Sequence, residues 1–397
     1  MSKRLRDVAE VHYGRSPNEV LTEDSPIPII GTGGIYGRAS RAMYNGPAVV
    51  VPRKGSLGNP QYVDEPFWPV DTTYAVIPKT GIDAKWLYYS LDTFDLTKLN
   101  EATGVPSISR DWLYKVPVGS GEYGEQHRIA EILSTVDNAI EQTEALIAKY
   151  QQIKAGLMHD LFTRGINPDG RLRPTRAQAP HLYKESPLGW IPREWGVVPI
   201  EDLCGDIVDC PHSTPTYVQS GIPCIRTADM QPGQLLLDQA YRVAEEEYWE
   251  CVARLVPQRG DVIYSREGER LGIASPVGNE RVCLGQRVML LRPGSNTDPD
   301  FLLWAMNTPL FYRRIVAGLG ATTSPHVNVG DIRKALLRRP SSSEQKIIGR
   351  LLARQTILLN AEELQLSKLK QIKQGLMHDL LTGRVCVKVA EPAGDTV

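Results

Sequence analysis

Two segments of the chain carry nearly the same sequence. Residues 151–163 read QQIKAGLMHDLFT, and residues 370–382 read KQIKQGLMHDLLT. An offset of 219 residues aligns them, and the same offset reaches back without a gap to Glu125 and Glu344. Self-similarity of this length at one offset indicates an internal repeat. The chain therefore consists of two copies of one plan.

Each repeated segment is predicted to form a long helix. Between Glu125 and Arg164 there is no proline, and Gly156 is the single glycine. Apolar residues recur in steps of three and four, which is the pattern of a coiled-coil seam. The predicted seam residues are Leu133, Val136, Ile140, Ile147, Leu157, Leu352, Leu359, Leu366, Leu369 and Leu376. A helix of about 40 residues is about 60 Å long and must bury its apolar stripe, so we expect the two helices to pair in antiparallel fashion.

The segments before the two helices differ from them in amino-acid composition. They are rich in glycine and proline and contain short apolar runs, which indicate strands between turns. The sequence predicts strands at 48–51, 74–77, 261–264 and 288–291 and helices at 84–91 and 301–315. The expected fold class is mixed α/β, with two globular domains separated by the helices. The predicted boundaries are 1–123 for the first domain, 124–166 for the central helical region, 167–189 for a linker, 190–340 for the second domain, 341–385 for the distal helical region and 386–397 for a tail.

Composition limits the class of protein. The chain has 397 residues, 42% of them hydrophobic, and a formal net charge of −1, which is ordinary globular composition. A nucleic-acid binder with this balance must gather its positive charge locally. Six cysteines occur without a C-x-x-C pair, and no apolar run is long enough to span a membrane. We therefore expect a cytoplasmic protein with reduced thiols, no signal peptide and no metal site.

At this point the repeated helix ends resemble a known family. Gly156-Leu-Met-His-Asp and Gly375-Leu-Met-His-Asp are similar to the helix ends of type I restriction–modification specificity subunits. The run 53–58 (RKGSLG), followed by 67–73 (FWPVDTT), looks like that family's target-recognition domains. The resemblance covers nearly the whole chain in the order domain, helix, domain, helix.

This resemblance implies a division of labour. Each domain would bind one half of an interrupted double-stranded DNA sequence, and the helices would set the spacer between the halves. Two methylation subunits and the restriction subunits would be the partners. S-adenosylmethionine, ATP and Mg would belong to those partners, so this chain would hold no cofactor and would not be an enzyme.

Candidate DNA-binding residues lie on polar loops of both domains. Two pairs of segments correspond between the halves: 50–55 with 263–268, and 103–108 with 322–327. Arginine can bind guanine, and asparagine or glutamine can bind adenine, with two hydrogen bonds. The candidates are Tyr36, Arg38, Arg41, Arg53, Lys54, Asn59 and Gln61 in the first domain and Arg226, Arg266, Glu267, Arg270, Thr322, Thr323, His326 and Asn328 in the second.

The competing function is a stand-alone DNA methyltransferase or nuclease. Asn59-Pro60-Gln61-Tyr62 is similar to the N-P-P-Y loop of amino-methyltransferases, but no cofactor-binding glycine motif accompanies it at a strand end, so a turn is favoured. The pairs His159-Asp160 and His378-Asp379 have no nucleophile or third ligand nearby in sequence. We interpret them as helix ends or partner contacts rather than as catalytic groups.

Overall fold

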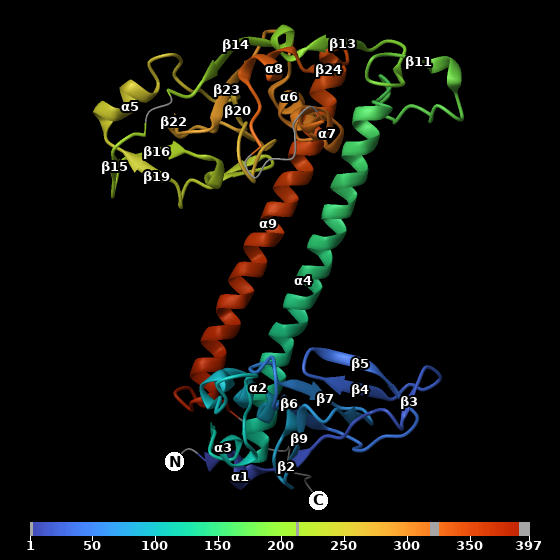
Figure 1. The fold of residues 1–397 in the computed structure, drawn as a ribbon, viewed down its shortest axis with the longest axis vertical. Coiled ribbons are helices and arrows are strands. Elements are labelled where there is room, and N and C mark those ends of the chain that lie inside the picture. Colours follow the sequence, from blue (N-terminus) through green and yellow to red (C-terminus); the bar gives the residue numbers. More distant parts are fainter. Residues whose placement is uncertain (1–2, 212–213, 318–324, 389–397) are drawn as a thin grey trace, which may run out of the picture. The chain divides into compact units, whose positions relative to one another are not determined.

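The computed structural model describes residues 3–211, 214–317 and 325–388 (Figure 1). Contacts divide the chain into two compact units, which are described separately. Unit 1 comprises residues 1–145 and 364–397, and unit 2 comprises residues 146–363. The division falls within the two long helices, so each unit contains one globular domain and a part of each helix. The domain boundaries expected from the sequence divide the chain into consecutive segments. The division into units does not test them, so they remain predictions.

Unit 1 is built on two four-stranded sheets. The first is antiparallel and has the order β2-β9-β6-β7, and the second has the order β3-β5-β4-β8, with β4 and β8 parallel. The strands of the first sheet are β2 (Ala9–Tyr13), β9 (Thr73–Pro78), β6 (Ala48–Pro52) and β7 (Gln61–Val63). Those of the second are β3 (Leu21–Thr22), β5 (Gly34–Ala39), β4 (Pro28–Gly31) and β8 (Trp68–Pro69).

Unit 2 has the same topology. Its sheets have the orders β14-β23-β20-β21 and β15-β19-β16-β22, and β16 and β22 form the parallel pair that corresponds to β4 and β8. The first sheet contains β14 (Cys204–Asp209), β23 (Val288–Pro293), β20 (Val262–Ser265) and β21 (Ala274–Pro276). The second contains β15 (Tyr217–Val218), β19 (Tyr241–Val243), β16 (Ile222–Ile225) and β22 (Cys283–Leu284). The internal repeat therefore includes the globular domains, and the α/β fold class is confirmed.

A helix packs on the first sheet of each unit. In unit 1 this is α2 (Ala84–Thr93), whose Trp86 and Leu87 pack among Val49, Val51 and Val76. The single helix predicted at 301–315 is wrong, because the structure has α6 (Pro299–Met306) followed by α7 (Pro309–Val316). Thr308 caps α7 and Pro309 occupies its first position, and a proline there ends the preceding helix.

The two long helices are α4 (Tyr123–Thr163) and α9 (Ser342–Leu381), as the sequence predicts. In unit 1, Lys373 and Lys370 of α9 form ion pairs of 2.8 Å with Asp137 and Glu144 of α4, respectively. Residue numbers rise along one helix as they fall along the other. In unit 2, Leu161 and Phe162 of α4 share a core with Ile348 and Leu352 of α9. In the same unit Gln355 of α9 donates to the Tyr150 carbonyl of α4 at 3.5 Å, so both units show the expected antiparallel pairing.

Every residue of the predicted seam is buried or half-buried. Leu133 and Leu352 are fully buried, and Ile147 and Leu359 are 9% exposed. Two threonines that the apolar pattern did not identify, Thr143 and Thr356, are also buried in these helices. Each hydroxyl donates to the carbonyl four residues earlier, at 2.8 Å in both cases, which satisfies its hydrogen bond locally.

Short elements complete the two domains. Strand β1 (Lys3–Arg4) pairs with β10 (Pro117–Val118), and β13 (Gly196–Pro199) pairs with β24 (Leu336–Arg339) in the corresponding place of unit 2. The other helices are α1 (Leu5–Val8), η1 (Leu96–Leu99), α3 (Arg110–Leu113), η2 (Pro180–Leu182), η3 (Ile200–Leu203), η4 (Thr227–Asp229), α5 (Glu245–Cys251) and α8 (Val329–Lys334). The remaining strands are β11 (Tyr183–Lys184), β12 (Ile191–Pro192), β17 (Met230–Gln231) and β18 (Gln234–Leu235).

Candidate nucleic-acid interface

Two loops meet at the end of β6 in unit 1. Gly55 has a φ of +81°, which glycine adopts without strain, and its N–H donates to the Pro106 carbonyl at 2.9 Å. The Ile108 N–H donates to the Arg53 carbonyl at 3.0 Å, and Lys54 and Ser107 form an isolated bridge. The loop at 53–58 is therefore joined to the loop at 103–108.

The same connections recur at the end of β20 in unit 2. Gly268 has a φ of +80° and donates to the Pro325 carbonyl at 2.9 Å. The Val327 N–H donates to the Arg266 carbonyl at 3.0 Å, and Glu267 and His326 form the bridge. The segments that correspond between the halves of the sequence are thus brought together in each unit by equivalent backbone contacts.

The side chain of Arg53 lies against aromatic rings. Its guanidinium is 4.9 Å from the ring centre of Tyr13 and 5.6 Å from that of Tyr74, and it donates to the Asp71 carbonyl at 3.1 Å. The guanidinium of Arg110 also lies over the ring of Tyr13, 5.4 Å from the ring centre. Burial raises the pKa of Tyr74 to about 12, so the ring stays neutral. The cluster offers cationic groups held in place by rings.

Sequence reasoning missed the partners of Arg53. Tyr13 ends strand β2, and Arg110 begins helix α3, both far from Arg53 in the chain. The cluster forms because β2, β6 and β9 are neighbours in one sheet. Only the strand order could have revealed this contact, and the sequence alone does not give it.

Arg266, the counterpart of Arg53, is placed differently. Its side chain is 4% exposed, and Nε and one terminal nitrogen donate to the two carboxylate oxygens of Asp209 at 3.0 and 3.2 Å. The other terminal nitrogen lies 3.0 Å from Glu267, whose carboxylate is also 2.9 Å from His326 Nδ1. In this arrangement Arg266 organises the loop and is not an exposed donor. Asp209 was also missed by sequence reasoning.

One of the other candidates of unit 1, Tyr36, lines a groove of about 610 Å³. It is lined by residues 16–18, 31–36 and 70–72. Tyr36 is 67% exposed on this lining, and Gln61 Nε2 donates to the Gly31 carbonyl at 2.8 Å from the adjoining strand. Arg38, Arg41, Lys54 and Asn59 are exposed, with Arg38 donating to the Pro26 carbonyl at 2.6 Å. Of the candidates in unit 1, Tyr36 is part of the lining of this groove, and Gln61 contacts the lining through Gly31.

The remaining candidates of unit 2 are more strongly held. Arg226 donates to both oxygens of Asp229 at 3.0 Å and lies 3.6 Å from the ring centre of Tyr241. Arg270 donates to the Ala228 carbonyl at 2.7 Å. Asn328 Nδ2 donates to Asp331 at 3.2 Å, and Asn328 Oδ1 lies 3.2 Å from His326 Nε2. Thr322 and Thr323 lie outside the described residues.

The two His-Asp pairs lie in the last turns of the long helices. The hydroxyls of Thr163 and Thr382 donate to the carbonyls of His159 and His378. Asp160 forms an ion pair of 3.2 Å with Arg164. Among residues 3–211, 214–317 and 325–388 no cluster of three potential metal ligands occurs. No helix within these ranges is long and apolar enough to span a bilayer.

Comparisons with known proteins agree with this architecture. Residues 1–152 match the family described as the type I restriction modification DNA specificity domain. The chain is 23% identical over 315 residues to the type I restriction enzyme MjaVIII specificity subunit of Methanocaldococcus jannaschii, covering 77% of this chain and 71% of that one. The putative MjaX specificity subunit of the same organism is 22% identical over 331 residues, with 78% and 70% covered.

A solved structure has the same fold along nearly the whole chain. The S subunit of a type I restriction–modification system from M. genitalium superposes with a TM-score of 0.66 at 17% sequence identity. The superposition covers 96% of each chain. The likeness in fold therefore extends beyond residues 1–152, the region that the family match covers.

Proposed function

We propose that the chain is a specificity subunit of the type I restriction–modification family and that it binds a bipartite DNA sequence, with one half-site for each globular domain. The observation that carries this proposal is the repeated loop pair. Equivalent backbone contacts hold 53–55 against 106–108 and 266–268 against 325–327, on sheets of one topology. Side chains differ at both loop pairs, which is what two domains with different half-sites require.

Exchanging one domain tests the assignment of half-sites. Residues 1–123 are replaced by the corresponding domain of another specificity subunit, and methylated adenines are mapped in the DNA of a host that carries the methylation subunits. One half of the methylated sequence is expected to change and the other to stay. A change of both halves together would contradict the assignment of one domain to one half-site.

The affinity for DNA rests on phosphate contacts in this proposal. Lys54, Arg38, Arg41 and Arg110 are exposed cations of unit 1 that suit such contacts. Binding by the isolated chain is expected to be weak, to strengthen with the methylation subunits and to fall steeply as salt rises from about 50 to 200 mM. A binding constant that does not depend on salt would argue against a phosphate-dominated interface.

The long helices serve as the spacer in this proposal. Inserting seven residues into each helix keeps the seam in register and adds about 10.5 Å, or roughly three base pairs. We expect a preferred spacer longer by one to about three base pairs, or loss of activity, because three base pairs also rotate a half-site by roughly 100°. Unchanged methylation at the original spacing would show that the helices do not set the distance.

Recruitment of partners uses exposed surface of the helices. On the part of α9 that belongs to unit 2, Leu351, Ile357 and Leu358 are 37%, 68% and 41% exposed, beside the exposed Lys346 and Arg350. Apolar side chains exposed in this number on one helix are typical of a docking surface. The proposed occupants of this surface are methylation subunits, and restriction subunits would join the same complex. The proposed location of the complex is the cytoplasm.

In this division of labour the chain itself carries no catalytic step. S-adenosylmethionine, ATP and Mg would bind the partner subunits. Incubating the purified chain with S-adenosylmethionine and DNA is expected to give no methyl transfer until a methylation subunit is added. Turnover by the chain alone would favour the competing function, a stand-alone methyltransferase.

A further inference from the structure

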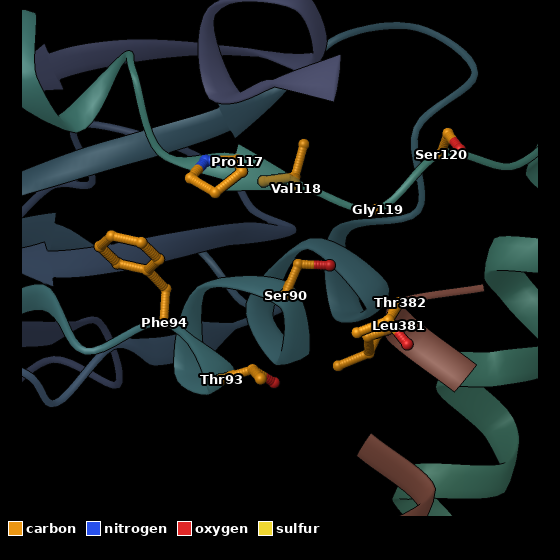
Figure 2. A pocket seen from close by; sticks show the side chains of 9 residues that line it. All are labelled: Ser90, Thr93, Phe94, Pro117, Val118, Gly119, Ser120, Leu381 and Thr382. Atoms are coloured by element: carbon orange, nitrogen blue, oxygen red, sulfur yellow. The ribbon is translucent and has the colours of Figure 1, made fainter. Parts of the chain in front are cut away.

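A pocket of about 410 Å³ lies in unit 1 between helix α2, strand β10 and the end of α9 (Figure 2). Its lining consists of Ser90, Thr93, Phe94, Pro117, Val118, Gly119, Ser120, Leu381 and Thr382, none of which is charged. The DNA-binding candidates do not contribute to it. It is therefore a separate feature of the domain.

Unit 2 has an equivalent pocket, which is filled. Two matching contacts establish the equivalence, because Gln126 and Gln345 accept from the N–H of Asp83 and Asp298, which cap α2 and α6. Counting from these caps, Ser90 corresponds to Ala305 and Thr93 to Thr308, both in the lining of the second pocket. This pocket has a volume of only about 20 Å³.

An arginine of the chain itself fills the pocket of unit 2. Arg338 donates to the carbonyl of Phe162, in the last turn of α4, and to the carbonyl of Leu188 in the linker at 3.0 Å. Burial, together with the neighbouring Arg314, lowers the pKa of Arg338 to about 10, but the group remains charged at neutral pH. A guanidinium thus covers the end of this long helix.

The equivalent arginine is missing in unit 1. At an offset of 219 residues Arg338 corresponds to Gly119 and Phe162 corresponds to Leu381. A Cβ at Gly119 would lie 2.7 Å from the Leu381 carbonyl oxygen, so the backbone occupies part of the space of a side chain. No hydrogen bond from the described residues reaches this carbonyl, although the ends of helices normally receive such bonds.

A second acceptor in the pocket also has no partner. Ser90 is 6% exposed, and no described residue forms a hydrogen bond with its hydroxyl oxygen. Figure 2 shows this hydroxyl pointing from α2 toward the end of α9 that carries Leu381 and Thr382. The pocket therefore combines an uncapped carbonyl, a buried hydroxyl and apolar walls, which suits a donor-only group on an apolar stem.

We propose that this pocket binds an arginine side chain of a partner protein, which covers the end of α9 as Arg338 covers the end of α4. The inference rests on the proposed function in naming the partner as a methylation subunit. Arginine is favoured over lysine because a planar guanidinium can donate to two acceptors that lie apart, as Arg338 does.

Titration with an arginine analogue tests the pocket without any partner. The full chain, with labelled leucine and valine methyl groups, is titrated with N-acetyl-arginine methylamide and followed by NMR. Saturable shifts are expected at Val118 and Leu381 but not at Leu337, which lines the filled pocket of unit 2. The citrulline analogue has the same shape without the charge and is expected to bind at least tenfold more weakly.

Two matched tryptophan variants control for the site. Thr93 and Thr135 are exposed helical threonines whose hydroxyls both donate to the carbonyl four residues earlier, but only Thr93 lines the pocket. Thr93→Trp is expected to weaken binding of the analogue at least tenfold, whereas Thr135→Trp leaves it unchanged. Equal binding of both analogues, equal shifts at Leu337 or no saturable shift would overturn the arginine pocket.

Co-purification with the methylation subunit tests the partner. Thr93→Trp is expected to retain at least tenfold less of that subunit than the unmodified chain. Equal retention would overturn the assignment of the arginine to this partner even if the analogue binds. Failure of the unmodified chain to retain the subunit would instead count against the proposed function, and the titration would still report on the pocket.

Discussion

The two units share a topology but use their corresponding polar groups differently. In unit 2, Arg266 is held by Asp209 and Glu267, Glu344 is buried, and Arg338 fills a pocket. The counterparts in unit 1 are a half-buried Arg53 on aromatic rings, a half-buried Glu125 and an open pocket. A sheet topology can thus be kept while the side chains on it change from internal ion pairs to groups available for ligands.

The largest difference in stability between corresponding variants of the two units is expected at Glu344 and Glu125. Glu344 accepts from both terminal nitrogens of Arg173, from Trp195 Nε1 at 3.0 Å and from the Ile166 N–H at 2.8 Å. Glu344→Ala leaves a buried arginine without its main partner and is expected to cost about 3–5 kcal/mol. Glu125→Ala removes a half-buried carboxylate and is expected to cost about 1 kcal/mol or less.

Urea unfolding followed by tryptophan fluorescence measures both variants. A conservative control, Glu344→Gln, keeps the size and one acceptor but removes the charge, so an intermediate loss is expected. Similar losses for Glu344→Ala and Glu125→Ala would show that the two helix starts are equally anchored. The contrast between the units at this position would then be wrong.

The seam provides the next comparison, because Leu359 and Ile140 occupy the same place in the repeat. Leu359 is 9% exposed, whereas Ile140 is half-buried. Leu359→Asp places a charge in the seam of unit 2 and is expected to cost about 3 kcal/mol. Ile140→Asp is expected to cost roughly half as much, because water can reach part of its carboxylate. Thermal unfolding of the two variants checks the order, and the reverse order would contradict the burial of the seam.

Much of the fold was predictable from the sequence, for a physical reason. The stripe of 133, 140, 147 and its counterpart in the second copy follows from helical periodicity, which is a local property. The strands at 48–51 and 288–291 follow from apolar runs bounded by turn residues. Pro309 was visible in the sequence as well, and the break that it causes between α6 and α7 should have been predicted.

The candidate site was less predictable, because it depends on contacts across the sheets. The correspondence of Gly55 with Gly268 was visible in the sequence, and the structure shows what it does, since both donate to the opposite loop. The neutralisation of Arg266 was not visible, because Asp209 lies 57 residues away on β14. The sequence around a loop arginine does not indicate whether its guanidinium will contact a carboxylate or an aromatic ring in the folded protein.

A moderate effect is expected when the two loop arginines are removed. Arg266→Ala removes the guanidinium that pairs with the carboxylates of Asp209 and Glu267, at a cost of about 1–3 kcal/mol to the stability of unit 2. Arg53→Ala is expected to cost about 1 kcal/mol, since it removes contacts with two rings. Under the proposed function, Arg53→Ala is also expected to weaken DNA binding, and by more than its loss of stability accounts for. Urea unfolding and a DNA-binding titration on the same samples separate the two effects, and equal stability losses would contradict the different roles.

The smallest effect is expected at Lys54 and Glu267, the residues that directly follow the two loop arginines in the sequence. Lys54 is exposed, whereas Glu267 is 22% exposed and contacts Arg266, His326 and Arg287. If Lys54 contacts one phosphate, Lys54→Ala should weaken binding to all DNA sequences similarly and reduce the slope of log affinity against log salt by about 0.9. Glu267→Gln keeps the size of the side chain and one acceptor oxygen and is expected to leave that slope within about 0.3 of the original, because no phosphate contact is lost. Fluorescence anisotropy at four salt concentrations on specific and nonspecific duplexes measures both slopes. An unchanged slope for Lys54→Ala would mean that the loop of unit 1 does not touch the DNA backbone. An equal change for both variants would mean that the loop pairs act through general charge, and the contrast between an open and a neutralised loop would no longer describe how the two units bind.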